Sequence, residues 1–277
     1  MGSGPDDIRA ETRIETADPE TTLKAVTDWF AEAGDLAALG IASFGPIELD
    51  PRSDRWGFIT NTPKPGWQNT DFAGRISRAL GVPVAFDTDV NAAALAEVCW
   101  GAAKGQRVSV YVTVGTGIGG GLVIDGKTHR GLSHPEMGHF RPRLDPSDAG
   151  FAGVCPIHGA CLEGLASGPA IRARWGMELS ALSQDHPAQE IVAGYLAQLV
   201  VTLQAMFQPG RIILGGGVMA SPGLLERVRL QAIQQGGGYF RGDVREILTL
   251  PGLGDRSGLL GALALALDLS GSQSSSA

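Results

Sequence analysis

Residues 133–169, SHPEMGHFRPRLDPSDAGFAGVCPIHGACLEGLASGP, contain the most informative side chains of the chain. His139 is followed, after fifteen residues, by Cys155, His158 and Cys161 in the pattern C-x2-H-x2-C. Two imidazoles and two thiols suit tetrahedral Zn²⁺, and four protein ligands are typical of a structural zinc site. The pattern therefore predicts a structural zinc loop over 139–161. The alternatives are a Cys155–Cys161 disulfide or ordinary core packing.

Two carboxylates flank these four residues. Glu136 lies three residues before His139, and Glu163 lies two residues after Cys161. A metal that fixes the loop would also hold Glu136 and Glu163 as a pair of hydrogen-bond acceptors, which a polyhydroxy ligand needs. The alternative is that both are solvated surface charges.

Length and composition exclude several classes of protein. The chain has 277 residues, 43% hydrophobic and 18% charged, as expected of a globular, soluble protein. The net charge of −7 argues against a general nucleic-acid-binding protein. We find no run of about 18 apolar residues that predicts a membrane span and no signal-peptide core. Only three cysteines occur, two of them in the metal pattern, which favours the cytoplasm.

Predicted strands and helices alternate along the chain, and the pattern restarts near residue 105. We expect strands at 8–16, 36–44, 82–86, 108–114, 211–214 and 247–250, and helices at 18–33, 71–80, 90–102, 187–208, 222–235 and 257–269. This alternation predicts an α/β protein with two lobes and a cleft between them. The lobes are expected at 1–105 and 106–256, with helix 257–269 packing back towards the first lobe and a disordered tail at 270–277.

Two glycine-rich turns are candidate nucleotide contacts. Gly115–Gly121 lies between two strands, where free backbone N–H groups and the Thr116 hydroxyl can face an anion. Gly215–Gly217 lies between a strand and a helix, where the backbone can approach a nucleotide. Each could instead be only a tight turn. Neither is a P-loop, and the G-x-G-x-x-G at 115–120 leads into a strand, so the Rossmann interpretation fails.

Asp89 lies between a strand and a helix. Its simplest role is the helix N-cap. Its functional alternative is a general base at the cleft end of the strand.

The chain resembles the ROK family of sugar kinases, in particular its bacterial zinc-containing fructokinases. The matching segments span residues 42–219 in the order and spacing of the family. They are ASFGPI (42–47), TPKPGW (62–67), TDVNAAAL (88–95), TVGTGIGGG (113–121), GLSHPEMGH (131–139), CPIHGACLEGLASGPAIRARWG (155–176) and ILGGGVM (213–219).

The resemblance implies an actin-like, ribonuclease-H-like ATPase fold and ATP-dependent phosphorylation of a hexose at its 6-hydroxyl. D-fructose is the expected substrate, with mannose or glucose as alternatives. Asp89 would be the catalytic base. The other implied site residues are Asn91, Glu136, His139 and Glu163 for the sugar, and Gly115, Thr116, Gly117, Gly119, Gly215, Gly216 and Gly217 for ATP. Mg²⁺, a structural Zn²⁺ and a homodimer are also implied.

The sequence departs from the family at its start. The family begins with a strand that carries a D/E-x-G-G-T-K phosphate loop, and residues 1–11 align just after that strand. We therefore expect a first lobe without that strand, and slow turnover by the chain as printed. The alternatives are a start placed too late and a sugar-binding relic with weak activity. A ROK repressor would need an N-terminal helix-turn-helix, for which the sequence shows no pattern.

Overall fold

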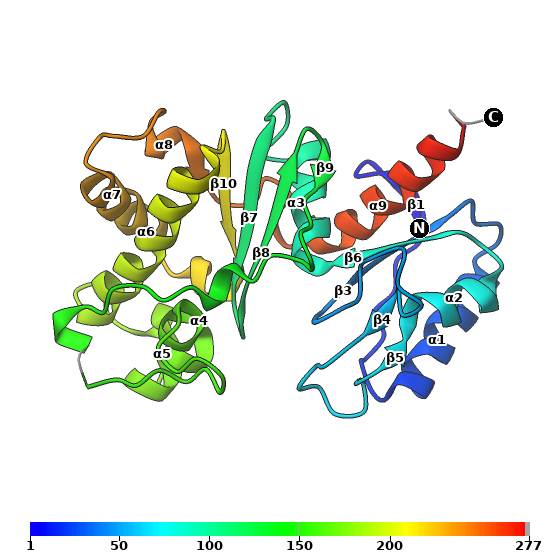
Figure 1. The fold of residues 1–277 in the computed structure, drawn as a ribbon, viewed down its shortest axis with the longest axis horizontal. Helices are drawn as coiled ribbons and strands as arrows, with labels where there is room; N and C mark the ends of the chain where they lie inside the picture. Colours follow the sequence, from blue (N-terminus) through cyan, green and yellow to red (C-terminus); the bar gives the residue numbers. More distant parts are fainter. Residues whose placement is uncertain (149, 275–277) are drawn as a thin grey trace.

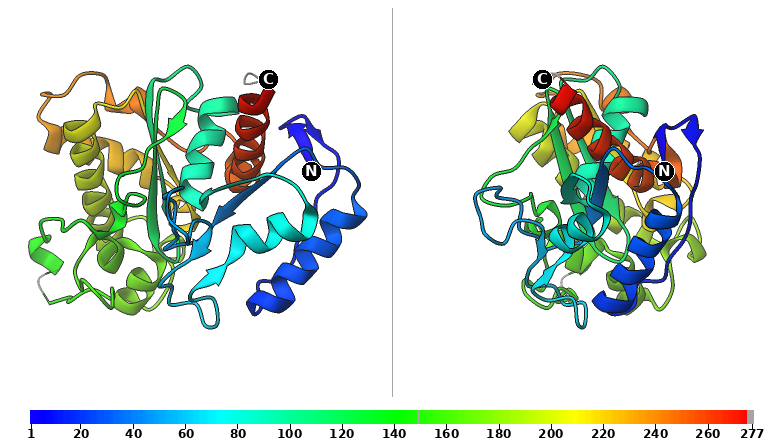
Figure 2. Two further views of the ribbon diagram at one scale, coloured as in Figure 1. Left: turned by 45° about the vertical axis from the view of Figure 1, so that its right-hand side comes forward. Right: turned by 90° about the vertical axis from the view of Figure 1, so that its right-hand side faces the viewer.

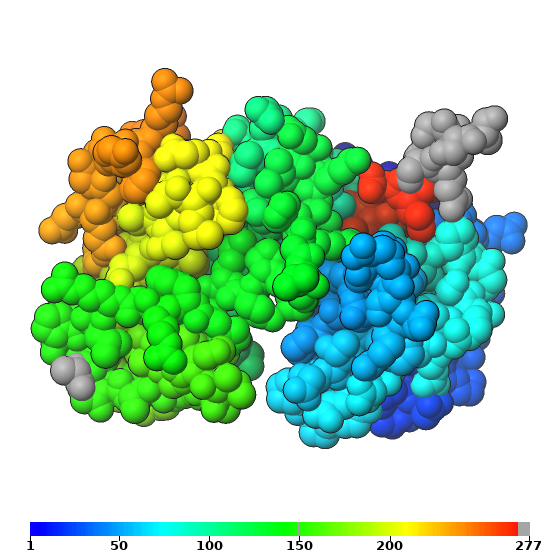
Figure 3. Space-filling view, viewed as in Figure 1, coloured from blue at the N-terminus to red at the C-terminus, as the bar shows by residue number. Residues whose placement is uncertain are grey.

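The computed structural model describes residues 1–148 and 150–274. Strands and helices form two lobes, drawn on the right and left of Figure 1. The space-filling view in Figure 3 shows a cleft that opens between the lobes at the bottom of the molecule. The predicted two-lobed α/β architecture is confirmed.

The first lobe is built on two parallel strands, β3 (Leu39–Ser43) and β6 (Val84–Thr88). Ser43 lies opposite Thr88, so both carboxyl ends reach the same edge of the pair. Apolar side chains of two helices, α1 (Pro19–Glu32) and α2 (Phe72–Leu80), share one core with the strands. A short antiparallel pair, β4 (Phe58–Ile59) and β5 (Thr70–Asp71), completes the lobe near the cleft.

The second lobe contains a five-stranded sheet in the order β11-β10-β7-β8-β9. Strand β10 pairs in parallel with β7 and β11, whereas β7–β8 and β8–β9 are antiparallel. The bounds are β7 Val108–Val114, β8 Ile118–Ile124, β9 Lys127–Thr128, β10 Arg211–Gly215 and β11 Leu248–Thr249. Asp125 and Gly126 both have positive φ, as a two-residue hairpin turn requires.

Helices cover both faces of this sheet. On one side lie α6 (Pro187–Phe207) and α7 (Leu224–Gly236), at the left of Figure 1. On the other side, alanines of α3 (Asp89–Trp100) pack on side chains of β7, β8 and β10. Three short helices complete the lobe: α4 (Leu162–Ala166), α5 (Gly168–Trp175) and α8 (Val244–Ile247).

Helix α9 (Ser257–Ser274) joins the two lobes because it crosses α3 and also packs on β3. Two glycines permit this close packing. A Cβ at Gly261 would lie 2.4 Å from the carbonyl carbon of Ala92 in α3, and one at Gly40 would lie 1.8 Å from the Ala262 oxygen in α9. The helix continues beyond the predicted end at residue 269, so the expectation of a disordered tail is wrong for 270–274; residues 275–277 lie outside the described part.

The predicted strand at 8–16 is wrong. The chain forms only a small hairpin, β1 (Gly2–Gly4) with β2 (Asp7–Ile8), and residues 9–17 are irregular. The alternation of polar and apolar residues there has no neighbouring strand with which to pair. In both views of Figure 2 the hairpin lies near α9.

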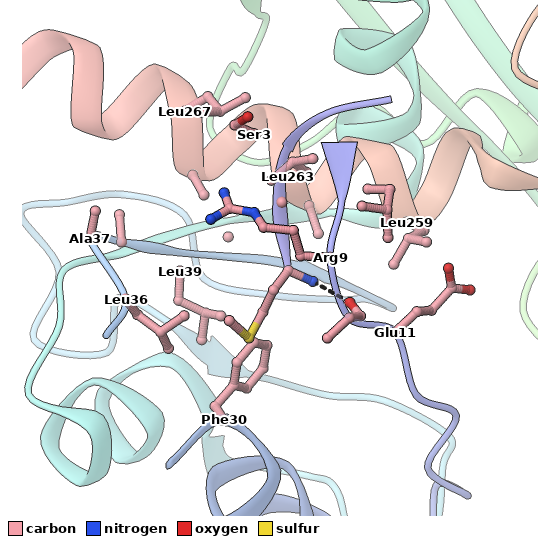
Figure 4. A pocket seen from close by; sticks show the side chains of 18 of the residues that line it. Ser3, Arg9, Glu11, Phe30, Leu36, Ala37, Leu39, Leu259, Leu263 and Leu267 are labelled. Atoms are coloured by element: carbon pink, nitrogen blue, oxygen red, sulfur yellow. Dashed lines mark hydrogen bonds between the residues drawn. The ribbon is translucent and has the colours of Figure 1, made fainter. Parts of the chain in front are cut away.

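An apolar cavity of about 560 Å³ lies between this N-terminal segment, α1, β3 and α9. Figure 4 shows Phe30, Leu39 and Leu263 facing it, and the Met1 ammonium bonds the Ala10 carbonyl oxygen at 2.7 Å beside it. Among the described residues, β3 pairs with β6 alone.

Helix α6 is, within the described residues, the one helix with the length and apolar composition of a membrane span. Most of its side chains belong to the core of the second lobe, which explains its apolar composition.

Candidate active site in the cleft between the lobes

Asp89 lies at the cleft end of β6, at the first position of α3. The N-cap of α3 is Thr88, whose hydroxyl accepts a hydrogen bond from the Asn91 N–H at 3.1 Å. Asp89 is therefore not needed as the cap, and its carboxylate accepts a hydrogen bond from the Val90 N–H at 2.8 Å. The side chain is open to the cleft but deeply set in it, and this desolvation raises the pKa of Asp89. A raised pKa suits a general base.

Asp87 and Asn91 support the start of α3. The Asp87 carboxylate is fully buried and accepts hydrogen bonds from Asn91 Nδ2, Thr128 Oγ1 and Arg130 Nη2, each at 2.8 Å. These bonds join the end of β6 to the segment after β8, in the other lobe. Asn91 is itself fully buried, with Oδ1 unpartnered. Asn91 is thus enclosed at the start of α3, whereas Asp89 is open to the cleft. The contact of Asn91 with a sugar stays a prediction.

The four predicted metal ligands come together. The ligand atoms of His139, Cys155, His158 and Cys161 all lie within 4.8 Å of one another. The sulfur–nitrogen distances are 3.5 Å for Cys161–His139, 3.9 Å for Cys155–His139 and 3.8 Å for Cys155–His158. Tetrahedral zinc with ordinary bond lengths places such atoms about 3.5 Å apart. Both cysteines are free, so the disulfide alternative fails.

Local packing explains the shape of this loop. Gly164 follows the last ligand, and a Cβ there would lie 1.8 Å from the Gly159 oxygen and 3.1 Å from the Cys155 side chain. Burial raises the pKa of the Cys161 thiol, and the Gly164 N–H acts in the opposite direction. A bound cation would favour the thiolate.

Glu136 lies between two histidines. Its carboxylate is 3.9 Å from His139 Nε2 and 3.5 Å from His134 Nδ1. Since His139 turns Nδ1 towards the cysteines, the ring has one nitrogen for a metal and the other near a carboxylate. A carboxylate at that position orients a metal-bound imidazole. The Glu136 side chain is half exposed, so it can also accept hydrogen bonds from a ligand.

Glu163 connects the zinc loop with the first glycine-rich turn. Its Oε2 accepts a hydrogen bond from the Ile118 N–H at 2.9 Å. A Cβ at Gly117 would lie 2.8 Å from the same oxygen, so a side chain there would displace the Glu163 carboxylate. The four predicted ligands, Glu136 and Glu163 thus form one connected unit of the second lobe.

A second cavity, of about 360 Å³, brings the two glycine-rich turns together. Gly115, Thr116 and Gly217 line it. The start of α5 forms another wall through Gly168 and Pro169. The Gly168 N–H bonds the Gly115 oxygen at 2.8 Å, which fixes the turn against the helix. This space, the nucleotide cavity, is the candidate site for the phosphates of ATP.

The remaining predicted nucleotide residues do not line this cavity. Gly119 lies in β8 against Val90, and Gly215 lies over the Tyr111 hydroxyl. Gly216 has φ +89 and lies against the Val114 backbone, which explains why only glycine fits there.

Sequence reasoning missed several residues of the site. Arg172 and Glu178 form an ion pair on the wall of the nucleotide cavity. The S-G-P at 167–169, an N-cap followed by a proline typical of a first helical turn, was the available signal for that helix start. His134, in the same stretch as Glu136, was also missed.

Comparisons with known proteins agree with this geometry. The sequence profile of the ROK family matches residues 6–269. A fructokinase of Zymomonas mobilis is 53% identical over 266 residues, which cover 93% of this chain and 88% of that protein.

Two solved structures are also similar. The ROK hexokinase of Thermus thermophilus superposes with a TM-score of 0.78 at 30% identity and covers 94% of this chain and 90% of that one. A ROK family glucokinase of Streptomyces griseus in complex with glucose and AMPPNP gives a TM-score of 0.71 at 26% identity, covering 91% and 89% of the two chains.

Proposed function

Because this chain belongs to the ROK family, we propose that it transfers the γ-phosphoryl group of ATP to the 6-hydroxyl of D-fructose. The observation that carries this proposal is the position of Asp89. Asp89 follows the carboxyl end of β6 and is open to the cleft. Thr88, not Asp89, caps the helix α3. The Asp89 carboxylate is thus available to accept the proton of an attacking hydroxyl.

The two lobes divide the reaction between them. Asp89 takes the proton of the 6-hydroxyl as that oxygen attacks the γ-phosphorus. Glu136 and Glu163, on the zinc loop side, accept hydrogen bonds from other hydroxyls of the sugar. The backbone and hydroxyl of Thr116, in the cavity between the two glycine-rich turns, bind the phosphates. Mg²⁺ bound together with ATP would supply charge neutralisation at the transferred group.

We assign a structural Zn²⁺ to His139, Cys155, His158 and Cys161. Two thiols and two imidazoles at tetrahedral spacing support zinc over magnesium or calcium, which prefer oxygen ligands. Its role here is to hold the loop that carries Glu136 and Glu163. We also propose a cytoplasmic homodimer, on the basis of the family resemblance.

The function is tested by following ADP formation with D-fructose, D-glucose and D-mannose, and by locating the phosphate on the product by NMR. We expect the highest kcat/KM with fructose and a 6-phosphate product. Equal ADP formation without sugar, or a preference for glucose, would contradict the proposal. Hexose binding without any turnover would favour the sugar-binding relic.

A further inference from the structure

His134 has an unusual environment for an imidazole. Its side chain is only 7% exposed, and Nε2 is buried without a hydrogen-bond partner. Nδ1 lies 3.5 Å from Glu136 Oε1, longer than an ordinary hydrogen bond. Buried polar atoms nearly always have partners, so a side chain of this kind requires an explanation.

The neighbours of His134 are groups of the proposed sugar site. Its Nε2 lies 3.3 Å from the position that a Cβ of Gly45 would occupy. Gly45 and Asp89 follow β3 and β6, whose carboxyl ends are adjacent because Ser43 pairs with Thr88. The ring therefore lies where the first lobe meets the segment that carries Glu136.

The carboxylate of Glu136 also indicates which ring nitrogen carries the proton. A carboxylate beside Nδ1 favours the tautomer that carries the ring proton on Nδ1. Nε2 is then an acceptor, and the group that satisfies it must be a donor. The Gly45–Pro46 turn that faces Nε2 offers no such bond. A sugar hydroxyl in the cleft is a donor of this kind.

We propose that His134 is a sugar-binding residue whose Nε2 accepts a hydrogen bond from a hydroxyl of the hexose, while Glu136 holds Nδ1. The inference rests on the proposed function, because it concerns the same cleft. The sugar site then contains a neutral acceptor, His134 Nε2, in addition to the carboxylates of Glu136 and Glu163. This acceptor lies against the first lobe. Binding of the sugar then requires the Gly45–Pro46 turn to give way at Nε2.

The test compares three variants by steady-state kinetics and by calorimetry of hexose binding without ATP. His134→Leu keeps the approximate volume and removes the acceptor, and we expect the KM and Kd for the hexose to rise about tenfold, the usual order for one lost hydrogen bond. His134→Gln keeps a polar group near Nε2 and should recover most of the affinity. The KM for ATP should stay within about twofold. His129→Leu, at an exposed histidine after β9, is the matched control and should change nothing.

Monodeoxy sugars identify the hydroxyl. The wild type should lose affinity for the one analogue that lacks the contacted hydroxyl, and His134→Leu should not distinguish this analogue from the parent sugar. If His134→Leu unfolds at lower temperature but binds the hexose as tightly as the wild type, the ring only packs against Gly45 and the inference is wrong. If the wild type itself neither binds nor phosphorylates any hexose, the proposed function fails instead.

Discussion

At the scale of single residues, the chemistry depends on the contrast between Asp87 and Asp89. They are two positions apart, yet their surroundings differ. Asp87 is buried and accepts hydrogen bonds from three side chains. Asp89 faces the cleft, and its carboxylate accepts a hydrogen bond from the backbone N–H of Val90. The first fixes the helix start and the second is available to react. The sequence alone did not separate the two roles, because hydrogen-bond partners 41 and 43 residues away decide them.

The raised pKa of Asp89 predicts the pH dependence of turnover. The base must be ionised, so kcat/KM for fructose should fall as the pH drops through its pKa. Desolvation moves that pKa above 3.8, and the Val90 N–H opposes the shift. We therefore expect an acid limb above pH 3.8 in the pH profile of kcat/KM. Hexose binding at each pH serves as the control for folding, and a profile that stays flat down to that pH would argue against Asp89 as the base.

At the scale of elements, the crossing of α3 and α9 depends on a single glycine. Gly261→Ala places a Cβ 2.4 Å from the Ala92 carbonyl carbon, and the overpacking should cost about 1–3 kcal/mol of unfolding free energy or more. Gly258 in the same helix has open space around its Cβ position, so Gly258→Ala should stabilise the protein by up to about 1 kcal/mol. Denaturant unfolding of both variants measures the difference. Equal effects would show that the helices do not pack this closely.

The zinc loop is the second element with a direct test. Protein purified without added zinc should contain about one Zn²⁺ per chain, and Cys161→Ala should lose it, because a structural site needs all four ligands. Loss of the metal should also weaken fructose binding, since Glu136 and Glu163 depend on the loop. Cys99→Ala is the control, because Cys99 is exposed and far along the chain from the four ligands. A metal-free wild type of equal stability would contradict the assignment.

The elements were predictable to different degrees. The β-branched run 108–114 and the helical spacing in 187–207 fixed those elements within a residue or two, because long periodic segments have few alternatives. The strand expected at 8–16 failed because alternation cannot supply a pairing partner. The convergence of His139, Cys155, His158 and Cys161 was predictable from residue type and spacing. The burial of Asn91 and the unpartnered ring of His134 depend on contacts between distant segments, which no local pattern reveals.

At the scale of the whole molecule, Glu97 joins the end of α3 to the segment that leads into α9. It is fully buried and accepts hydrogen bonds from the N–H groups of Ala102, Gly252 and Leu253 and from Ser257 Oγ, at 2.7–3.1 Å. Desolvation is the main reason why the pKa of Tyr111 is raised to about 12, and the Glu97 carboxylate is the second reason. Tyr111 lies beneath Gly215. One buried charge thus connects the helix that carries Asp89 with the strand end near the nucleotide cavity.

Glu97→Ala should therefore destabilise the whole protein. It leaves several buried donors without their charged acceptor, and we expect a loss of at least about 3 kcal/mol in the free energy of unfolding. Glu226→Ala is the matched control, because Glu226 forms only an exposed ion pair with Arg229 and should change stability by about 1 kcal/mol or less. If the two variants unfold alike, Glu97 does not stabilise the junction between α3 and α9.

The central claim is that the cleft phosphorylates a sugar hydroxyl with Asp89 as the base. The most direct measurement is fructose-dependent ADP formation by the wild type and by Asp89→Asn, together with the Kd for fructose of each. Because Thr88 caps α3, the variant should fold and bind fructose normally. Turnover should fall by about 10²–10⁴-fold, the usual contribution of general-base catalysis. A variant that keeps turnover close to that of the wild type would contradict the account.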